Sequence, residues 1–377
     1  MSVTGNTSLE FSEEQAMLMD VAQEFCRDKS PIAAVREQLE TATGFDQAVW
    51  DEMVALGWTG IALPEACGGS AMGVATVVPV VEAMGRAMLG TPLVSTTLAS
   101  HLLMRASEAE QVQGLLAEVV DGAIATVALL DNGDWGDTRI QCSLDAEGVL
   151  QGQKLFVTDA SVASFFVVVA EQQGTPALAV VRADALPADA IKERVLIDQT
   201  KRSANIDFTG VKAEQVISGE KVVSALRDLR LLGALLTAAE TTGSTSACID
   251  TITEYLTTRK QFGQLIGSYQ ALKHPTVEIL NQYNYARSFI YHAATLIDDG
   301  SLSEDAEVAC RMAKAQASDA LAYGGDRAVQ FHGGMGFTYE CDAQLYIRRA
   351  QWVQQQFGDA MHHRKRLATL LLDPLVA

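Results

Sequence analysis

Apolar residues recur at helical spacing from about residue 10 to residue 120. Ser12 stands just before Glu14 and Gln15, so it is suited to cap the start of a helix there. In the stretch SEEQAMLMDVAQEFCRD, one stripe of that helix would carry Leu18, Val21, Ala22 and Phe25. This periodicity predicts an α-helical domain over residues 1–121.

Short β-rich runs replace the helical pattern from about residue 123 to residue 218. They read TVALL, FFVVVAE, ALAVVRA and ANIDFTGV, and turn signals such as LDAEG and EQQG separate them. Such runs between turn residues are typical of a small antiparallel sheet. We therefore predict a β domain over residues 122–219.

Helical spacing returns from about residue 222 in longer segments. Breaks are expected at residues 263–267, 298–300, 324–325 and 333–336, where glycines interrupt the pattern. Ser301 and Glu304 have the spacing of a capping box for the third of these helices. Long helices with short connections predict an antiparallel four-helix bundle over residues 220–377. The predicted fold class is α+β: an N-terminal α-helical domain, a middle antiparallel β domain and a C-terminal four-helix bundle.

Composition narrows the classes of function. A chain of 377 residues with 48% hydrophobic content can bury a large core, and a formal net charge of −19 argues against a nucleic-acid surface. The six cysteines are scattered without metal-ligand spacing, which favours reduced core thiols and no metal site. The start MSVTGNTSLEFSEEQ has no signal-peptide pattern, and no apolar run approaches the length of a membrane span. We expect a cytoplasmic protein.

One charged residue stands out in the run LRLLGALLTAAETTG. The ten residues from Leu231 to Glu240 contain two polar side chains, and Glu240 is the only charged one. A lone carboxylate on an apolar helix is costly to bury unless it is paired, neutralised or used in chemistry. Glu240 is therefore either a functional carboxylate or a buried or interface residue paired with an Arg such as Arg227 or Arg230.

Two stretches of the predicted bundle are suited to ligand contacts. In TRKQFGQLIGSYQ, residues 258–270, a long helix ends in a glycine-bounded turn that carries Arg259, amides and an aromatic ring. In QFHGGMGFTYE, residues 330–340, glycines allow the backbone to approach a ligand closely. Taken singly, the first stretch could be a turn with a solvated Arg, and the second an ordinary loop.

Together, in this order and at this spacing, the two stretches resemble the acyl-CoA dehydrogenase family. The resemblance extends over nearly the whole chain. GWTGIALPEACGG and VVEAMGRAMLGTP are similar to segments of the family's N-terminal domain, and LQGQKLFVTDASVASFFVVVA and VLIDQTKRSANIDFTGVKA to strands of its β domain. The resemblance implies the three-part fold predicted above, bound FAD, and oxidation of an acyl-CoA thioester.

The resemblance also implies roles for individual residues. Arg259, Gln261 and Phe262 would hold the FAD pyrophosphate and flank the cofactor, because the forked donors of Arg suit phosphate; Ile266 and Gln270 belong to the same stretch. Gln330, Gly333 and Gly334 would meet the adenine side of an FAD in a neighbouring subunit, which implies an oligomer. Phe156 and Thr158 would lie against the isoalloxazine. Outside the resemblance, Phe156 could be a core aromatic and Thr158 a plain strand hydroxyl.

The chain departs from the family pattern where the catalytic base usually stands. When YIRRAQWVQQQFGDA is laid on the family's pattern, Phe357 falls where a Glu base is usual and Asp359 where a Thr contacts the flavin. ALLDNGDWGDT also replaces a second family signature in the β domain. Some members carry the base on the first long helix of the bundle, and that position is Gly233 here.

Glu240 is the remaining candidate for the base. It lies seven residues after Gly233, nearly two turns, so it shares that face of the helix about 10 Å further along the axis. Bacterial members that act on bulky or steroid side-chain acyl-CoAs resemble this chain in the AAE-x-x-G and FGDA features. A base here would receive the α-proton of the thioester while the β-hydrogen leaves as hydride to flavin N5.

The histidines have plainer interpretations. His332 is expected to hydrogen-bond backbone or cofactor. The run of histidines and basic residues at 362–366 is expected to be a solvated helix end that favours the C-terminal dipole, with contact to CoA phosphates as the alternative.

The sequence thus predicts an FAD-dependent acyl-CoA dehydrogenase with an acyl-CoA substrate and electron-transfer flavoprotein as electron acceptor. The competing hypothesis is a catalytically silent dehydrogenase-like subunit that completes the FAD or acyl-CoA site of a hetero-oligomeric partner. A flavin oxidase or monooxygenase on the same fold is a third. The assembly would be a homodimer, a homotetramer, or a heterotetramer with a second acyl-CoA dehydrogenase-like chain.

Overall fold

The computed structural model describes residues 13–298 and 300–376. Its N-terminal part is helical, as the periodicity predicts. Ala22 and Phe25 of the predicted stripe are buried, whereas Val21 is 45% exposed and lies off that stripe. Ser12 falls outside the described residues. The helices are α1 (Glu13–Lys29), α2 (Ile32–Gln38), α3 (Gln47–Ala55), α4 (Val77–Arg86), α5 (Leu93–Ala106) and α6 (Ala109–Val120).

The middle part contains two sheets that are mainly antiparallel. The larger has the order β3-β2-β5-β6-β9, with β1 also paired to β5, and the smaller has the order β4-β8-β7. The pairings of β1 and β2 with β5 are parallel, which the sequence did not predict. The strands are β1 (Ala125–Ala128), β2 (Ser143–Leu144), β3 (Leu150–Gln151), β4 (Gln153–Thr158), β5 (Phe165–Gln172), β6 (Thr175–Arg182), β7 (Ile191–Glu193), β8 (Ser203–Asp207) and β9 (Gln215–Ser218).

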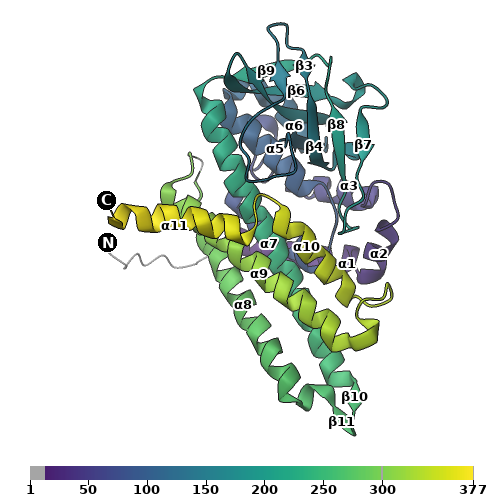
Figure 1. The fold of residues 1–377 in the computed structure, drawn as a ribbon. Coiled ribbons are helices and arrows are strands. Elements are labelled where there is room, and N and C mark those ends of the chain that lie inside the picture. The colour runs from purple at the N-terminus through teal and green to yellow at the C-terminus, as the bar shows by residue number, and fades with distance from the viewer. Residues whose placement is uncertain (1–12, 299, 377) are drawn as a thin grey trace.

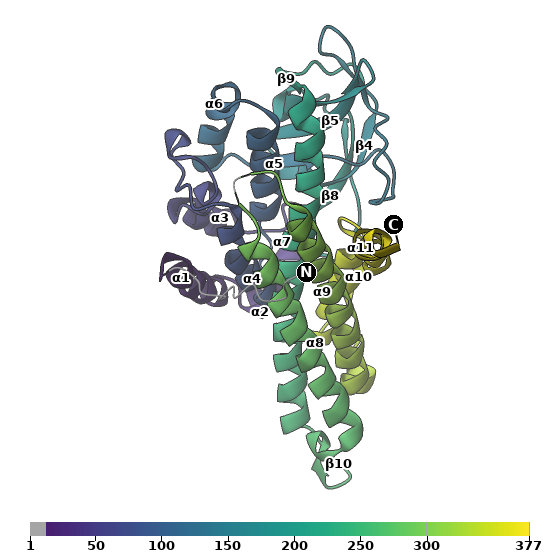
Figure 2. The same ribbon diagram turned by 90° about the vertical axis from the view of Figure 1, so that its left-hand side faces the viewer.

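The C-terminal part is a helical bundle, in which α7 to α10 run side by side and α11 crosses them (Figures 1 and 2). A short hairpin, β10 (Lys260–Gln261) with β11 (Gln264–Leu265), and the turn η6 (Ile266–Ser268) join the first two helices. The helices are α7 (Glu220–Thr258), α8 (Gln270–Thr295), α9 (Glu304–His332), α10 (Ala343–Gln355) and α11 (Ala360–Val376).

Two local predictions in the bundle are wrong. The cap of α9 is Ser303, whose hydroxyl accepts from the backbone N–H of Ala306, whereas Ser301 accepts from Arg105. The expected break at residues 324–325 is absent, because α9 continues to His332. A Cβ at Gly325 would come within 2.9 Å of the backbone of Ile347, so this glycine serves close packing of α9 against α10.

The small residues of AAETTG let α7 pack closely on α4. A Cβ at Gly85 would lie 2.0 Å from the carbonyl oxygen of Glu240, and Ser244 Oγ donates to the carbonyl of Gly85 at 2.8 Å. Thr241 and Thr242 direct their hydroxyls to carbonyls one turn back on α7. The middle of α7 is therefore fixed against the N-terminal helices, and this fixes the position of Glu240.

The six cysteines are all buried and free of disulfides, in agreement with the prediction of core thiols. Among the described residues, no helix is long and apolar enough to cross a membrane.

Candidate functional site

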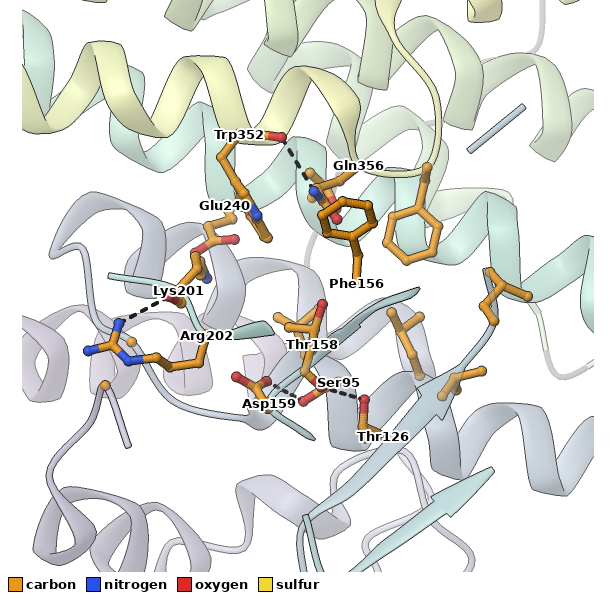
Figure 3. Close-up of a pocket in the computed structure, with 18 of the residues that line it drawn as sticks. Ser95, Thr126, Phe156, Thr158, Asp159, Lys201, Arg202, Glu240, Trp352 and Gln356 are labelled. Atoms are coloured by element: carbon orange, nitrogen blue, oxygen red, sulfur yellow. Dashed lines mark hydrogen bonds and ion pairs between the residues drawn. The ribbon is translucent and has the colours of Figure 1, made fainter. Parts of the chain in front are cut away.

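A pocket with about 920 Å³ of empty space, part of it open to solvent, lies where the three parts of the chain meet. Its walls come from α5, from β1 and β4, from the loop before β8, from α7 and from the end of α10 (Figure 3). Phe156, Thr158, Glu240 and Phe357 all line it, so the structure brings these sequence-predicted residues into one cavity.

The β-domain wall of the pocket is strained at Phe156. The pairing of β4 with β8 shifts in register between Lys154 and Val157, and Phe156 has a φ of 51°. Its backbone N–H donates to Asn205 Oδ1 at 3.2 Å. Left-handed backbone at a bulky residue is uncommon and often marks a ligand site. Beside it, the carbonyl of Thr158 accepts from Thr126 Oγ1 at 2.7 Å, which fixes the end of β4. This wall carries Phe156 and Thr158, the two residues that the resemblance assigns to the flavin ring.

Glu240 is 4% exposed and pairs with two cations. Lys201 Nζ lies 2.5 Å from its Oε1, and Arg349 Nη1 lies 3.0 Å from the same oxygen. Within the described residues, no hydrogen bond engages Oε2. The carboxylate is thus anchored through one oxygen, and the other is available on the pocket side of α7. The partners proposed from sequence are engaged elsewhere, since Arg227 pairs with Glu307 and Arg230 donates to backbone carbonyls.

Arg349 extends this ion pair into a buried cluster between the bundle and the β domain. Its guanidinium is fully buried and contacts Asp198 at 2.5 Å and Thr200 Oγ1 at 2.5 Å as well as Glu240. Lys201 also lies 5.2 Å from the centre of the Trp352 ring. Asp198 and Glu240 balance Arg349 and Lys201, and buried charges need such pairing. The cluster therefore holds the loop of residues 198–202 against α7 and α10.

Gly233 and Phe357, the two positions that the resemblance assigns to the base, face each other and carry no acidic side chain. A Cβ on Gly233 would lie 2.3 Å from the ring of Phe357, so only glycine fits opposite this ring. Phe357 also packs against Trp135, with ring centres 4.5 Å apart. Trp135 belongs to the loop DNGDWGD that departs from the family pattern. An aromatic pair therefore stands where the resemblance leads us to expect a base.

The other predicted cofactor residues lie at the far end of α7. Arg259, Gln261 and Gln270 are exposed around the β10–β11 hairpin, Phe262 is 85% exposed with a φ of 52°, and Ile266 is buried. Gln330, Gly333 and Gly334, at the end of α9, are exposed beside it. The Tyr255 and His332 rings stack at 4.1 Å and join the two segments, while His332 Nδ1 contacts the Ala328 carbonyl at 2.7 Å.

Figure 1 shows the β10–β11 hairpin at the opposite end of the molecule from the β domain. Eighteen residues separate Glu240 from Thr258 on α7, which is about 27 Å along the helix axis. The structure thus assembles two sets of cofactor-type residues: Phe156 and Thr158 in the pocket, and the exposed set at the hairpin end.

A second pocket adjoins the first, and its lining contains five arginines together with the carboxylates of Asp131, Asp134, Asp137 and Glu307. It shares Leu129, Leu130, Trp135 and Phe357 with the first pocket. Among the described residues, Arg230 and Arg366 have no carboxylate partner. His363 is buried without a hydrogen-bond partner for either ring nitrogen in the described chain, and burial lowers its pKa to about 3, so it is neutral. The remaining cationic or imidazole side chains of the lining are Arg139, Arg227, Arg311 and His362.

Sequence reasoning missed several residues that line the first pocket or lie directly behind its wall. Lys201 and Arg349 lie 39 and 109 residues from Glu240, so no local periodicity links them. Ser95 and Asp159 form a further pair, with Ser95 Oγ donating to Asp159 Oδ2 at 2.6 Å. The only sequence signal for Asp159 was its place directly after Thr158.

Comparison with known proteins identifies the family. The model "Acyl-CoA dehydrogenase, N-terminal domain" matches residues 12–123, and "Acyl-CoA dehydrogenase, C-terminal domain" matches residues 230–372. The acyl-CoA dehydrogenase IpdE2 of Mycolicibacterium smegmatis is 28% identical over 362 residues, covering 94% of this chain and 98% of that protein.

Two solved structures have the same fold throughout. The ChsE4–ChsE5 complex from Mycobacterium tuberculosis matches with a TM-score of 0.86 and 25% identity over 97% of this chain and 99% of that chain. A variant of the Tcur3481–Tcur3483 steroid ACAD matches with a TM-score of 0.85 and 26% identity, at the same coverage. The chain belongs to the acyl-CoA dehydrogenase family, the FAD-dependent oxidoreductases that act on CH–CH groups of acyl-CoA thioesters.

Proposed function

We propose that this chain catalyses the α,β-dehydrogenation of an acyl-CoA thioester to the 2,3-enoyl-CoA, with Glu240 as the proton acceptor. The observation that carries this proposal is the position of Glu240, a carboxylate in the same pocket as Phe156 and Thr158. FAD, when bound, supplies the acceptor for the β-hydrogen, which leaves as hydride. Glu240 and Asp159 are the only acidic residues among the described residues that line this pocket.

The surroundings of Glu240 suit the task of holding a base in place. Lys201 and Arg349 anchor Oε1, so Oε2 is presented in one orientation, which favours a positioned proton transfer. The contribution of Glu240 to the rate can be measured directly by mutation.

We assign the CoA part of the substrate to the second pocket. Arg230 and Arg366 are cations without a carboxylate partner in the described chain, and arginine forks suit phosphate oxygens. The shared wall of Trp135 and Phe357 would then lie beside the thioester, between the second pocket and the pocket that contains Glu240.

The exposed cofactor residues at the hairpin end support an oligomer. Arg259 and Gln261 lie about 27 Å along α7 from Glu240, so we assign them to an FAD whose ring sits in a neighbouring chain. That neighbour is a second copy or a second acyl-CoA dehydrogenase-like chain. The ChsE4–ChsE5 relative is a complex of two such chains. Electron-transfer flavoprotein is the proposed electron acceptor.

The test is Glu240→Gln, followed by rapid mixing of the FAD-loaded protein with acyl-CoA. The amide keeps the shape but cannot accept the α-proton, so flavin reduction should slow by about 100-fold to 10,000-fold. Asp198→Asn is the matched control, because Asp198 belongs to the same ion cluster but does not line the pocket. If Glu240 only stabilises the fold, both variants lose stability alike and Glu240→Gln reduces its flavin within tenfold of the parent rate.

A second function is favoured by the contact between Gly233 and Phe357. Since both usual base positions are apolar, the chain could instead complete the FAD or acyl-CoA site of a partner subunit that carries the base. The absorbance spectrum of the chain expressed alone separates the two functions. Bound flavin that bleaches on addition of acyl-CoA supports the enzyme, and flavin that appears only with a partner supports the silent subunit.

A further inference from the structure

Lys314 of α9 is a fully buried lysine that forms no ion pair within the described part of the chain. Burial lowers the pKa of its ammonium to about 7, because the charged form loses its water, although the charges of Asp359 and Asp319 favour that form. A buried amine of this kind needs hydrogen bonds in place of water. The groups that accept these hydrogen bonds therefore indicate what the side chain does.

The ammonium of Lys314 connects α9 to two other segments. Nζ donates to Ser318 Oγ at 3.0 Å on its own helix, to the Val353 carbonyl at 2.9 Å and to the Gly358 carbonyl at 3.0 Å. An ammonium has three N–H donors, so all of them are used. The Val353 carbonyl belongs to the last turn of α10, where no donor within the helix is available. Lys314 thus ties α9 to the end of α10 and to the turn at residues 356–359.

This turn has an unfavourable backbone conformation. Phe357 has a φ of 55° and Gly358 a φ of 100°. A Cβ at Gly358 would lie 2.7 Å from the ring of His362, so only glycine fits there. Left-handed backbone is uncommon at a bulky residue such as Phe357, and it persists only where the surrounding structure holds it. The hydrogen bond from Lys314 to the carbonyl directly after Phe357 is a restraint of this kind.

The turn determines where the Phe357 ring lies. Phe357 lines both pockets, and its ring packs against Trp135 and opposite Gly233. Lys314 lines neither of these two pockets, so it reaches them only through the turn. A movement of the turn would shift the ring and leave Glu240 in place, because Glu240 is held on α7 by its own ion pairs.

We propose that Lys314 is a positioning residue for the acyl-CoA site. By holding the Gly358 carbonyl it keeps the Phe357 ring at the boundary of the two pockets, where the ring packs against the substrate beside the thioester. Lys314 therefore supports acyl-CoA affinity rather than proton transfer to Glu240. This inference rests on the proposed function, which assigns the thioester to that boundary.

The test mixes the FAD-loaded protein, in its native assembly and without oxygen, with butyryl-CoA, octanoyl-CoA, palmitoyl-CoA or a steroid side-chain acyl-CoA. The concentration dependence of flavin reduction gives the apparent dissociation constant of the acyl-CoA and the limiting rate. Lys314→Met keeps most of the length of the side chain but removes all of its donors. It should raise the dissociation constant by about tenfold and change the limiting rate by less than about twofold.

A double-mutant cycle shows whether Lys314 acts through Phe357. Phe357→Ala should itself raise the dissociation constant by about tenfold, because it removes the ring. In that background Lys314→Met should add less than about twofold, because the ring that it positions is gone. Ser318→Ala is the matched control, since Ser318 also accepts from Lys314 but lies on the same helix and does not hold the turn. Its dissociation constant should stay within about twofold of the parent value.

Hydrogen exchange examines the turn without any acyl-CoA. In FAD-loaded Lys314→Met, the amides of residues 357–363 should exchange faster than in the parent, and those of the β10–β11 hairpin should be unchanged. The exchanging groups include the N–H groups of His362 and His363, which both bond to Asp359. If Lys314→Met does not fold, Lys314→Gln replaces it in every measurement, because its shorter side chain retains an amide donor.

The other results overturn the inference. Additive effects of Lys314→Met and Phe357→Ala would show that Lys314 does not act through the ring, and a loss confined to the limiting rate would contradict a role in affinity. Unchanged exchange would show that Lys314 does not hold the turn. If none of the acyl-CoAs reduces the flavin of the parent, the proposed function fails and the effect on affinity falls with it. Faster exchange in Lys314→Met would then still assign the turn to Lys314.

Discussion

The middle of α7 and the hairpin at its C-terminal end differ in how far their functional side chains are exposed. At Glu240 the charges are buried and paired within the chain, through Lys201 and Arg349. At the hairpin end, Arg259 and Gln261 are exposed, and the Phe262 ring is 85% exposed. The first region is complete in a single chain, whereas the second presents ligand-binding residues to solvent. The difference agrees with our proposal that the FAD held by the hairpin end is completed by a neighbouring chain.

The strongest test of this comparison is a measurement of the oligomeric state of the protein. If the exposed hairpin residues serve an FAD in another chain, the flavin-loaded protein should be a dimer, a tetramer or a heterotetramer. Light scattering or native mass spectrometry measures this directly, with flavin absorbance recorded on the same species. A monomer that holds stoichiometric FAD would show that the hairpin end is not needed for the cofactor.

The next test removes the central cation of the pocket. Arg349→Ala leaves Asp198 and Glu240 facing each other without their shared partner, so the free energy of unfolding should fall by about 3–5 kcal/mol. Arg348→Ala is the control on the same helix. Arg348 is partly exposed and bonds to Gln199 at 2.9 Å, so its loss should cost less than about 1 kcal/mol. Urea denaturation measures both, and similar losses would mean that the buried cluster contributes little.

Removal of an arginine at the exposed hairpin end should leave the stability of the protein almost unchanged and should instead weaken FAD binding. Arg259→Ala should leave the free energy of unfolding of the apoprotein within about 0.5 kcal/mol of the parent, because an exposed side chain contributes little to folding. It should lose most of its FAD, since a charge-assisted contact to pyrophosphate is removed. Arg327→Ala, on α9 and paired with the neighbouring Asp326, is the control. Retention of stoichiometric FAD by Arg259→Ala would refute the assignment.

Local sequence patterns predicted the order of the secondary-structure elements and the positions of the turns around Arg259 and Gly333. Helical spacing and short β runs depend on neighbouring residues, so the three-part fold and the segments around Arg259 and Gly333 could be predicted. The partners of Glu240 could not, because Lys201 and Arg349 reach it only through the folding of distant segments. Gly325 illustrates the same limit: glycine predicts a break locally, but here the close approach of Ile347 requires it within a continuous helix.

The smallest expected effect is a pH dependence at Asp159 in the pocket. Burial raises its pKa from 3.8 to about 6, so between these values the folded state binds more protons than the unfolded state. Stability from this group is therefore fully present below about pH 4 and is lost as the pH rises through about 6. Because part of the side chain faces the open pocket, we expect a loss on the order of 1–2 kcal/mol.

Asp159→Asn cannot titrate, so the parent should lose stability relative to this variant between pH 4 and pH 6. Urea denaturation at intervals across this range measures the difference, with Asp184→Asn, an exposed aspartate outside the pocket, as background. A difference that grows in favour of the parent with rising pH would mean that Asp159 is held by its cationic neighbours as a carboxylate, and the pocket wall would then resemble the paired charges around Glu240.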